Sequence, residues 1–286
     1  MKLRYYSLVV IFFSCIGFFV ILIMGSFLSA PHPSIVGSIP MGVPAKNVKF
    51  KSLNGNLLSG WYIPGEEKRG GVLLMHGVKL NRLQMLERAK FLNEAGYSVL
   101  LFDFQGHGES EGDQVTFGYL EAQDADSGFA FLESQLVNKS IGVIGFSLGG
   151  VAAILSSVLI KADALILESV FPTIEEAVSN RLTMRLGYIG RYFSPLLLWQ
   201  IKPRLGFDPK MLRPIEHISR ATGAVFVVAG SNDKRTTISE SRRLFEKARE
   251  PKEFWAISGA AHVDFYQYQP NEYKNKVLKF MEQNLR

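Results

Sequence analysis

The sequence VIGFSLGG, residues 143–150, decides the fold of this chain. It carries the pattern G-x-S-x-G around Ser147, which a chain of this composition contains by chance roughly 0.2 times, so the motif alone is weak evidence. Its context is stronger, because residues 141–146 predict a buried strand and residues 148–153 predict the start of a helix. A serine in such a strand-turn-helix corner is a candidate nucleophile.

Two physical features favour this interpretation of Ser147. Gly145 and Gly149 lack side chains that would collide in so sharp a turn, and the turn lifts the serine oxygen out of the sheet. The helix that follows presents unpaired N–H groups and the positive end of its dipole, which suit an oxyanion. The backbone N–H of Leu148 is therefore an expected oxyanion donor. The alternative is that Ser147 only caps the helix, as any serine before a helix can.

The rest of the chain alternates between short apolar runs and helical stretches, which is typical of an α/β protein. The runs suit strands that are buried on both faces of a parallel sheet. They are GVLLMH (71–76), YSVLLFD (97–103), IGVIGF (141–146), ALILES (164–169), AVFVVAG (224–230) and EFWAIS (253–258). Helices are expected over residues 80–95, 119–134, 148–161, 239–249 and 271–285.

Residues 48–64 alternate around Asn54-Gly55, which predicts an antiparallel hairpin before the parallel strands. We therefore expect a mostly parallel central sheet with an antiparallel N-terminal hairpin and helices on both faces. About fifty residues separate the runs 164–169 and 224–230, far more than such a link needs. This connection predicts a helical cap insertion at about 171–215.

A serine nucleophile needs a base, and the base needs an acid that orients it. Asp233 directly follows the run 224–230, and His262 follows the run 253–258. Because the carboxyl ends of parallel strands meet at one edge of a sheet, these side chains are expected beside Ser147 as a catalytic triad. Glu168, at the end of an earlier run, is the alternative acid.

The other polar candidates are expected to be structural. His76 and His107 lie in glycine-rich turns, where a ring that bonds loop backbone is the simpler interpretation. His32, His217, Asp208 and Asp264 lie outside the positions that the triad requires.

With all three residues in this order, the chain resembles the α/β-hydrolase superfamily from about residue 48 to the end. It is most similar to small-capped serine hydrolases of the esterase, lysophospholipase and monoacylglycerol-lipase kind. LLMHG (73–77) looks like the family's oxyanion strand, and DFQGHGES (103–110) is similar to its D-x-R-G-x-G-x-S turn. The resemblance implies that the N–H of Val78 is the second oxyanion donor. Gln105 replaces the usual arginine, and HGVKLN lacks the glycine run of HGGG-type lipases.

The N-terminus predicts a membrane anchor. Residues 8–30 are almost wholly apolar, and that length matches the roughly 20 residues that cross about 30 Å of hydrocarbon. We therefore expect a transmembrane helix within residues 1–30, followed by a proline-containing spacer over residues 31–45 and the hydrolase domain over residues 46–286. Lys2 and Arg4 precede the span, so the domain is expected on the extracytoplasmic side. The alternative is a cleaved signal peptide and a secreted domain.

The composition limits which ligands and partners are expected for this chain. The net charge is +6, but the basic residues are scattered without aromatic interleaving, so no nucleic-acid partner is expected. A basic surface that faces anionic lipid headgroups and a solvated surface without a partner both stay open. Cys15 is the only cysteine, and no cluster has metal-ligand spacing, so no metal and no cofactor is expected. Nothing in the sequence indicates the oligomeric state.

The expected function is that of a serine hydrolase of the carboxylesterase or lipase kind, which cleaves esters or thioesters through an acyl-enzyme. Lipid-like or long-chain acyl esters are the expected substrates, because one chain carries both the expected membrane anchor and an insertion rich in apolar and basic residues. The alternatives are acyl transfer or peptide hydrolysis by the same triad, and a non-catalytic protein of the same fold that only binds a ligand.

Overall fold

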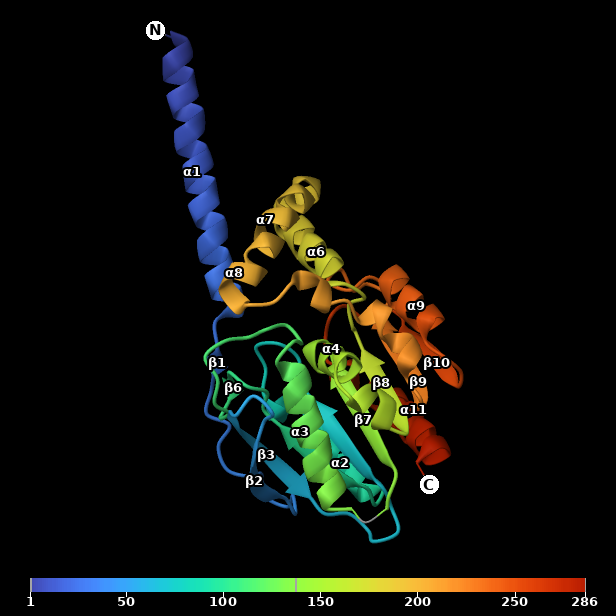
Figure 1. The fold of residues 1–286 in the computed structure, drawn as a ribbon. Coiled ribbons are helices and arrows are strands. Elements are labelled where there is room, and N and C mark those ends of the chain that lie inside the picture. The colour runs from blue at the N-terminus through green and yellow to red at the C-terminus, as the bar shows by residue number, and fades with distance from the viewer. Residues whose placement is uncertain (1, 137, 286) are drawn as a thin grey trace.

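The computed structural model describes residues 2–136 and 138–285 and, within the first helix, the side chains of Phe12 and residues 16–29. Its centre is an eight-stranded sheet of order β10-β9-β8-β7-β4-β5-β3-β2 (Figure 1). The strands are β2 (Lys46–Lys51), β3 (Leu57–Ile63), β4 (Gly71–Met75), β5 (Ser98–Phe102), β7 (Ile141–Phe146), β8 (Ala164–Glu168), β9 (Ala224–Gly230) and β10 (Lys252–Ile257). Strand β3 pairs antiparallel with both β2 and β5, and all other neighbours in this sheet pair in parallel, so the predicted mostly parallel sheet with an N-terminal hairpin is confirmed.

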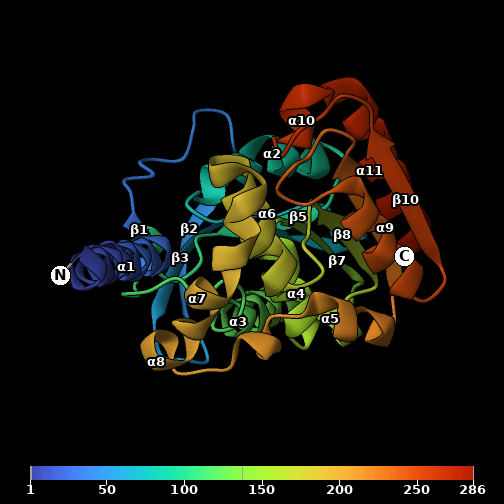
Figure 2. The same cartoon turned by 90° about the horizontal axis from the view of Figure 1, so that it is seen from above.

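Helices cover both faces of the sheet (Figures 1 and 2). One face carries α3 (Glu121–Ser134), α4 (Leu148–Leu155), α5 (Val158–Lys161) and α9 (Ile238–Lys247), and the other carries α2 (Leu86–Glu94) and α11 (Pro270–Asn284). A short helix, α10 (Phe265–Tyr268), follows β10.

Two predicted helices are each split in the structure. The stretch 80–95 begins with a 3-10 turn, η1 (Arg82–Met85), before α2. The stretch 148–161 breaks at Ser156, whose backbone is extended. The next residue, Ser157, bonds Asp126 of α3 through both its N–H (2.9 Å) and its hydroxyl (2.5 Å). This side-chain acceptor competes with the helix ladder and ends α4.

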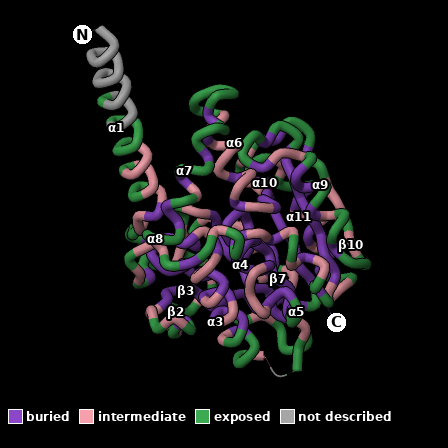
Figure 3. Tube along the Cα trace, turned by 45° about the horizontal axis from the view of Figure 1, so that its top comes forward, coloured by how far each residue is buried: buried purple, intermediate pink, exposed green. Residues whose placement is uncertain are grey.

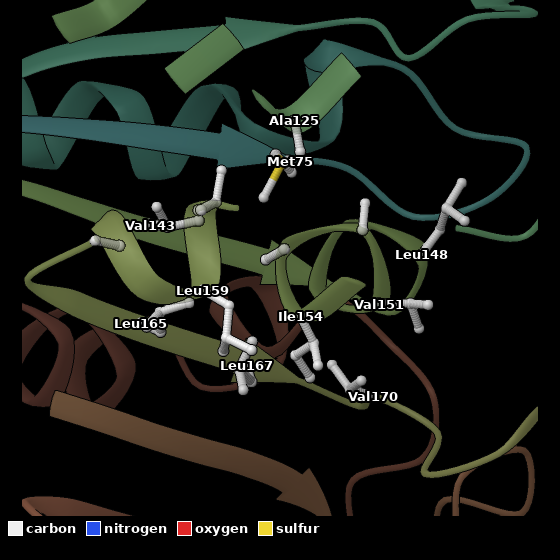
Figure 4. Packing of buried hydrophobic residues seen from close by; sticks show 14 of the residues in the cluster. Met75, Ala125, Val143, Leu148, Val151, Ile154, Leu159, Leu165, Leu167 and Val170 are labelled. Atoms are coloured by element: carbon white, nitrogen blue, oxygen red, sulfur yellow. The ribbon is translucent and has the colours of Figure 1, made fainter. Parts of the chain in front are cut away.

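The core consists of two layers, because alternate residues of each central strand point to opposite faces. Leu73 and Met75 of β4 join the layer under α3 and α4, whereas Val72 and Leu74 join the layer under α2 and α11. Figure 4 shows the first layer, in which Met75, Val143 and Leu165 pack with residues of α4 such as Ile154. Burial on both faces explains why the strands appear in the sequence as continuous apolar runs. Figure 3 shows the buried interior in purple.

The long connection after β8 forms a cap above the carboxyl edge of the sheet (Figures 1 and 2). Its elements are α6 (Ile174–Leu186), η2 (Gly187–Phe193), α7 (Ser194–Trp199), α8 (Ile201–Leu205), η3 (Pro209–Met211), η4 (Pro214–Glu216) and η5 (Ile218–Arg220). Thr173 starts α6 by accepting a hydrogen bond from the N–H of Glu176 (3.3 Å). Asn180 of α6 donates to the carboxylate of Glu240 on α9 (2.8 Å), which ties the cap to the main domain.

The N-terminal helix, α1 (Lys2–Ser29), corrects the expected membrane span. Across the described part of the chain, no helix combines the length and the apolar character that a membrane crossing requires, so the predicted transmembrane helix is wrong. A physical reason lies in its contacts, because Gln200 donates to the carbonyl of Ile21 (3.0 Å) and Arg204 donates to that of Leu22 (3.0 Å). This half of α1 therefore lies against α7 and α8 of the cap (Figure 1).

The structure describes the expected span only in part. The side chains of residues 1–11 and 13–15, Cys15 included, lie outside the described residues. The extracytoplasmic placement, and its alternative of secretion after signal cleavage, stay predictions.

The spacer and the turn after β5 form a contact that the sequence does not predict. Strand β1 (His32–Pro33) pairs in parallel with β6 (His107–Gly108). Beneath them, the buried Arg82 forms ion pairs with Asp103 and Glu109, and we call these three residues the Arg82 cluster. The cluster holds the turn 103–110 against η1.

The turn between β7 and α4 is sharp and closely packed. Ser147 has φ 49° and ψ −107°, a conformation that side chains rarely adopt. A Cβ on Gly149 would lie 2.3 Å from the carbonyl oxygen of Met75, and a Cβ on Gly145 would lie 2.5 Å from the nitrogen of Gly150. Helix α4 can therefore start this close to β4 and β7 only because both positions are glycine.

We predict that Gly149→Ala destabilises the protein by about 3 kcal/mol or more, because the backbone of a central strand cannot yield to the new methyl group. Urea unfolding followed by circular dichroism measures this loss. Gly17→Ala is the matched control, since no atom lies within 4 Å of its added Cβ. Equal stability of Gly149→Ala and wild type would contradict the described contact.

Candidate active site

The structure brings the three predicted side chains together at the carboxyl edge of the sheet. Ser147 lies between β7 and α4, Asp233 follows β9, and His262 lies between β10 and α10. Nε2 of His262 is 3.2 Å from Oγ of Ser147, and its Nδ1 is 2.7 Å from Oδ2 of Asp233. Two hydrogen bonds thus join hydroxyl, imidazole and carboxylate in one line, and this geometry can move a proton from the serine to the histidine.

Asp233 is held by four hydrogen bonds. Its Oδ1 accepts from the backbone N–H groups of Arg235 (2.8 Å) and Thr236 (3.0 Å). Its Oδ2 accepts from the hydroxyl of Ser169 (3.1 Å) in addition to His262. Burial alone would raise the pKa of Asp233, but the hydrogen bond and charge of His262, together with the two N–H groups, lower it below its usual value. The carboxylate is therefore ionised and fixed in position at neutral pH.

Ser169 is a site residue that the sequence does not single out. It directly follows β8, is buried, and has a φ of 51°. Its N–H donates to the carbonyl of Val228 on β9 (3.0 Å), so its hydroxyl reaches Asp233 across the strand boundary. The only signal in the sequence is its place at the end of a predicted strand, which it shares with Glu168.

Glu168, the alternative acid, contacts other residues. Its carboxylate bonds Arg88 (2.8 Å) and the hydroxyl of Tyr273, and all three side chains are buried. The backbone of Glu168 does reach the site, because its carbonyl accepts the N–H of Ser147 (2.8 Å).

The loop after β4 carries the expected oxyanion donor Val78. Gly77 fixes this loop, because its N–H donates to the side chain of Gln84 (2.8 Å) and its carbonyl accepts from Leu80 (3.2 Å). On the other side of the site, Leu148 is the first residue of α4, where the N–H groups have no carbonyl in a preceding helical turn. The donor roles of Val78 and Leu148 stay predictions.

The remaining candidates have local partners. Nδ1 of His76 donates to the carbonyl of Gly77 (2.8 Å), and its Nε2 accepts from the N–H of Phe104 (3.0 Å). His107 bonds the carbonyl of Gln105 (2.9 Å). Gln105, where the family pattern has arginine, accepts from Asn54 (2.7 Å) and Asn56 (2.9 Å) of the hairpin turn. Asp208 caps η3, and Asp264 caps α10 and also bonds Arg88.

Residues 66–212 match the family described as serine aminopeptidase, S33. Among curated proteins, an uncharacterized protein of Mycobacterium tuberculosis is 30% identical over 238 residues, which cover 82% of this chain and 78% of that protein. The uncharacterized protein YqkD of Bacillus subtilis is 24% identical over 235 residues, which cover 81% of this chain and 77% of that protein.

Solved structures of other proteins share the fold of this chain. The esterase Pf2001 of Pyrococcus furiosus superposes with a TM-score of 0.70 at 26% identity, covering 88% of this chain and 98% of that one. The α/β hydrolase GrgF of a Penicillium species has a TM-score of 0.65 at 19% identity, covering 84% of this chain and 99% of that one, and supports the fold alone.

We predict that His76 makes the fold sensitive to acid. Burial, and the neighbouring His107 after it, lower the pKa of His76 to about 3, whereas in the unfolded chain the ring titrates near 6.5. Between these values the unfolded state binds more protons, so stability falls as the pH falls. Between pH 7 and pH 5, protonation of this ring in the unfolded state lowers the free energy of unfolding by about 2 kcal/mol.

Urea unfolding of wild type and His76→Gln at both pH values isolates this contribution. The variant is expected to be less stable at pH 7 but to lose about 2 kcal/mol less on acidification. Parallel losses in the two proteins would show that His76 does not titrate in this range.

Proposed function

Because the chain belongs to the serine aminopeptidase S33 family of the α/β-hydrolase superfamily, we propose that it is a serine hydrolase that cleaves carboxylic esters or thioesters through an acyl-enzyme. The observation that carries this proposal is the hydrogen-bonded line from Ser147 through His262 to Asp233. The similarity to the esterase of Pyrococcus furiosus supports ester substrates.

The proposed mechanism follows from this line. Oγ of Ser147 attacks the substrate carbonyl carbon while its proton moves to Nε2 of His262, and Asp233 stabilises the imidazolium that forms. The N–H groups of Val78 and Leu148 would receive the oxyanion, each contributing roughly 3 kcal/mol. The protonated histidine then gives its proton to the departing alcohol or thiol. Water, activated by the same imidazole, attacks the acyl-enzyme and releases the acid.

An amphiphilic substrate fits the cap. Large apolar side chains are exposed on it, namely Met184, Leu186, Tyr188, Ile189, Tyr192, Phe193, Leu196 and Trp199. Leu182, Leu197 and Leu198, which the sequence groups with them, pack inward instead. The exposed set supports a long acyl chain or a lipid-like ester as the substrate.

Basic residues of the cap differ in their surroundings. Arg191 lies 3.7 Å from the ring of Tyr188, and Arg204 bonds α1. Arg185 and Lys202 are exposed.

Arg181 lies near the proposed site. It donates to the carbonyl of Ala177 (2.9 Å), and the charges of Asp233 and Glu240 partly compensate its own. Burial, followed by the charge of Arg235, lowers its pKa to about 10. A cation at this place would suit a substrate with an acidic headgroup.

The second candidate function is acyl transfer or peptide hydrolysis by the same residues. The description of the family as serine aminopeptidases favours a peptidase, and a relative named polyketide transferase grgF, 23% identical over 289 residues, favours a transferase. An acyl-enzyme can be released by water, an alcohol or an amine, so the shape of the pocket decides between these outcomes.

We predict that a fluorophosphonate probe labels the wild-type protein at Ser147. Ser147→Ala is expected to abolish labelling and to lower ester hydrolysis about 10³-fold or more, with the folded state retained. His262→Ala and Asp233→Asn are expected to slow both reactions strongly. Ser134→Ala, an exposed serine on α3, is the control and should react like wild type. Labelling that persists in Ser147→Ala would contradict the assignment, and a wild type that never reacts would favour a binding protein without catalysis.

We further predict that the specificity constant for p-nitrophenyl esters rises with acyl length from acetate to octanoate, because a longer chain buries more apolar surface against the cap. Each buried methylene is worth about 0.8 kcal/mol. Substitution of exposed Trp199 by Ser should flatten this dependence and leave acetate hydrolysis within about two-fold of wild type. Strict preference for acetate would exclude the long-chain substrate.

A further inference from the structure

Arg88 of α2 is a buried cation that the proposed mechanism does not use. Its side chain has no exposed surface, yet it makes hydrogen bonds in three directions. Nη2 donates to Glu168 (2.8 Å), Nη1 donates to both oxygens of Asp264 (3.0 and 2.9 Å), and Nε donates to the hydroxyl of Tyr273 (2.8 Å). We call these four residues the Arg88 cluster. An arginine is held so deeply only when carboxylates compensate its charge, and here two of them do.

The two carboxylates of the Arg88 cluster lie on different segments next to the site. Glu168 ends β8, and its carbonyl accepts the N–H of Ser147, so it is joined to the nucleophile turn. Asp264 lies two residues after His262 and starts α10 by accepting the N–H of Gln267 (3.1 Å). Arg88 therefore bridges the serine side and the histidine side of the site from beneath.

The histidine segment is held on both sides of His262. Before it, the carbonyl of Ala260 accepts the N–H of Asn232 (2.8 Å), which joins the segment to the loop after β9. After it, Asp264 anchors the segment to α2 through its bidentate contact with Arg88.

We propose that Arg88 is a positioning residue, which fixes the segment of His262 relative to Ser147 through its paired bonds to Asp264 and Glu168. This role rests on the proposed function. A hydrogen bond of 3.2 Å between imidazole and hydroxyl tolerates little displacement, since a shift of 1 Å in a reacting group can lower a rate about 10²-fold. Loss of the bridge would thus slow the chemical step and leave substrate binding by the cap unchanged.

Replacement of Arg88 itself would leave two buried carboxylates unpaired and could unfold the protein, so Asp264→Asn is the better probe. Its side chain is 12% exposed, and asparagine keeps the oxygen that caps α10 while it removes the charge that Arg88 binds. The Arg82 cluster offers a matched control. Arg82 is also buried between two carboxylates, of which Glu109 is 37% exposed, but it holds the turn 103–110 instead of the histidine segment.

The experiment compares Asp264→Asn and Glu109→Gln with wild type by thermal unfolding, by kcat and KM for p-nitrophenyl butyrate, and by the rate constant of fluorophosphonate labelling. Asp264→Asn is expected to lower kcat and the labelling rate about ten-fold with KM within two-fold. Glu109→Gln is expected to lower the melting temperature by a similar amount while both rates stay within two-fold of wild type.

Three results would overturn the role of Arg88. If wild type reacts and both variants react at its rate, the Arg88 cluster only stabilises the fold. If both variants slow the reaction equally, the loss follows from general loosening of the structure. A wild type that does not react with the probe overturns the proposed function, and the positioning role with it.

Discussion

The close crossing of α4 over β4 is the contact on which the site depends. Because Gly149 rests against the backbone of Met75, the helix begins directly at the end of β7 and leaves no room for a relaxed turn. Ser147 is therefore held in a backbone conformation that costs roughly 1–3 kcal/mol, and the packing of α4 in the core compensates this cost. The same crossing places the serine directly before the first N–H groups of the helix.

Sheet register brings the other two side chains to that point. Strands β8, β9 and β10 pair in parallel, so the loops after them leave the sheet at the same edge. Asp233 and His262 follow β9 and β10 at this edge, and Ser169 links the first of them back to β8. The sheet thus sets the coarse position of each group, and hydrogen bonds between loops set the final distance. Buried bonds of this kind resist displacement, because an unpaired partner in the interior is costly.

Much of the fold and of the candidate site could be predicted from the sequence, and each exception has its own physical cause. Buried parallel strands appear as continuous apolar runs, and a triad follows the ends of such strands, so both were accessible from local pattern. The Arg88 cluster was not, because its partners lie 80 and 176 residues away and an arginine in a helix usually faces solvent. The membrane helix was wrongly predicted because it rested on local apolar composition, which carries no information on contacts such as the bonds of Gln200 and Arg204 to α1. Ser169 was missed since a serine after a strand carries no distinctive pattern.

One short segment, η1 with α2, connects these features. Arg82 from its first turn holds the turn 103–110, Gln84 holds the loop that carries Val78, and Arg88 one turn later reaches the segment of His262. Residues 84 and 88 are four apart and therefore lie on the same face of the helix, toward the site. A helix on the face of the sheet away from α4 thus contacts the loops on both sides of the serine. The η1–α2 segment supports the loops of the candidate site from one side of the sheet edge, whereas the cap on the other side exposes apolar surface. This arrangement suits a site whose loops are held rigidly and whose cap can vary in the ligand that it contacts.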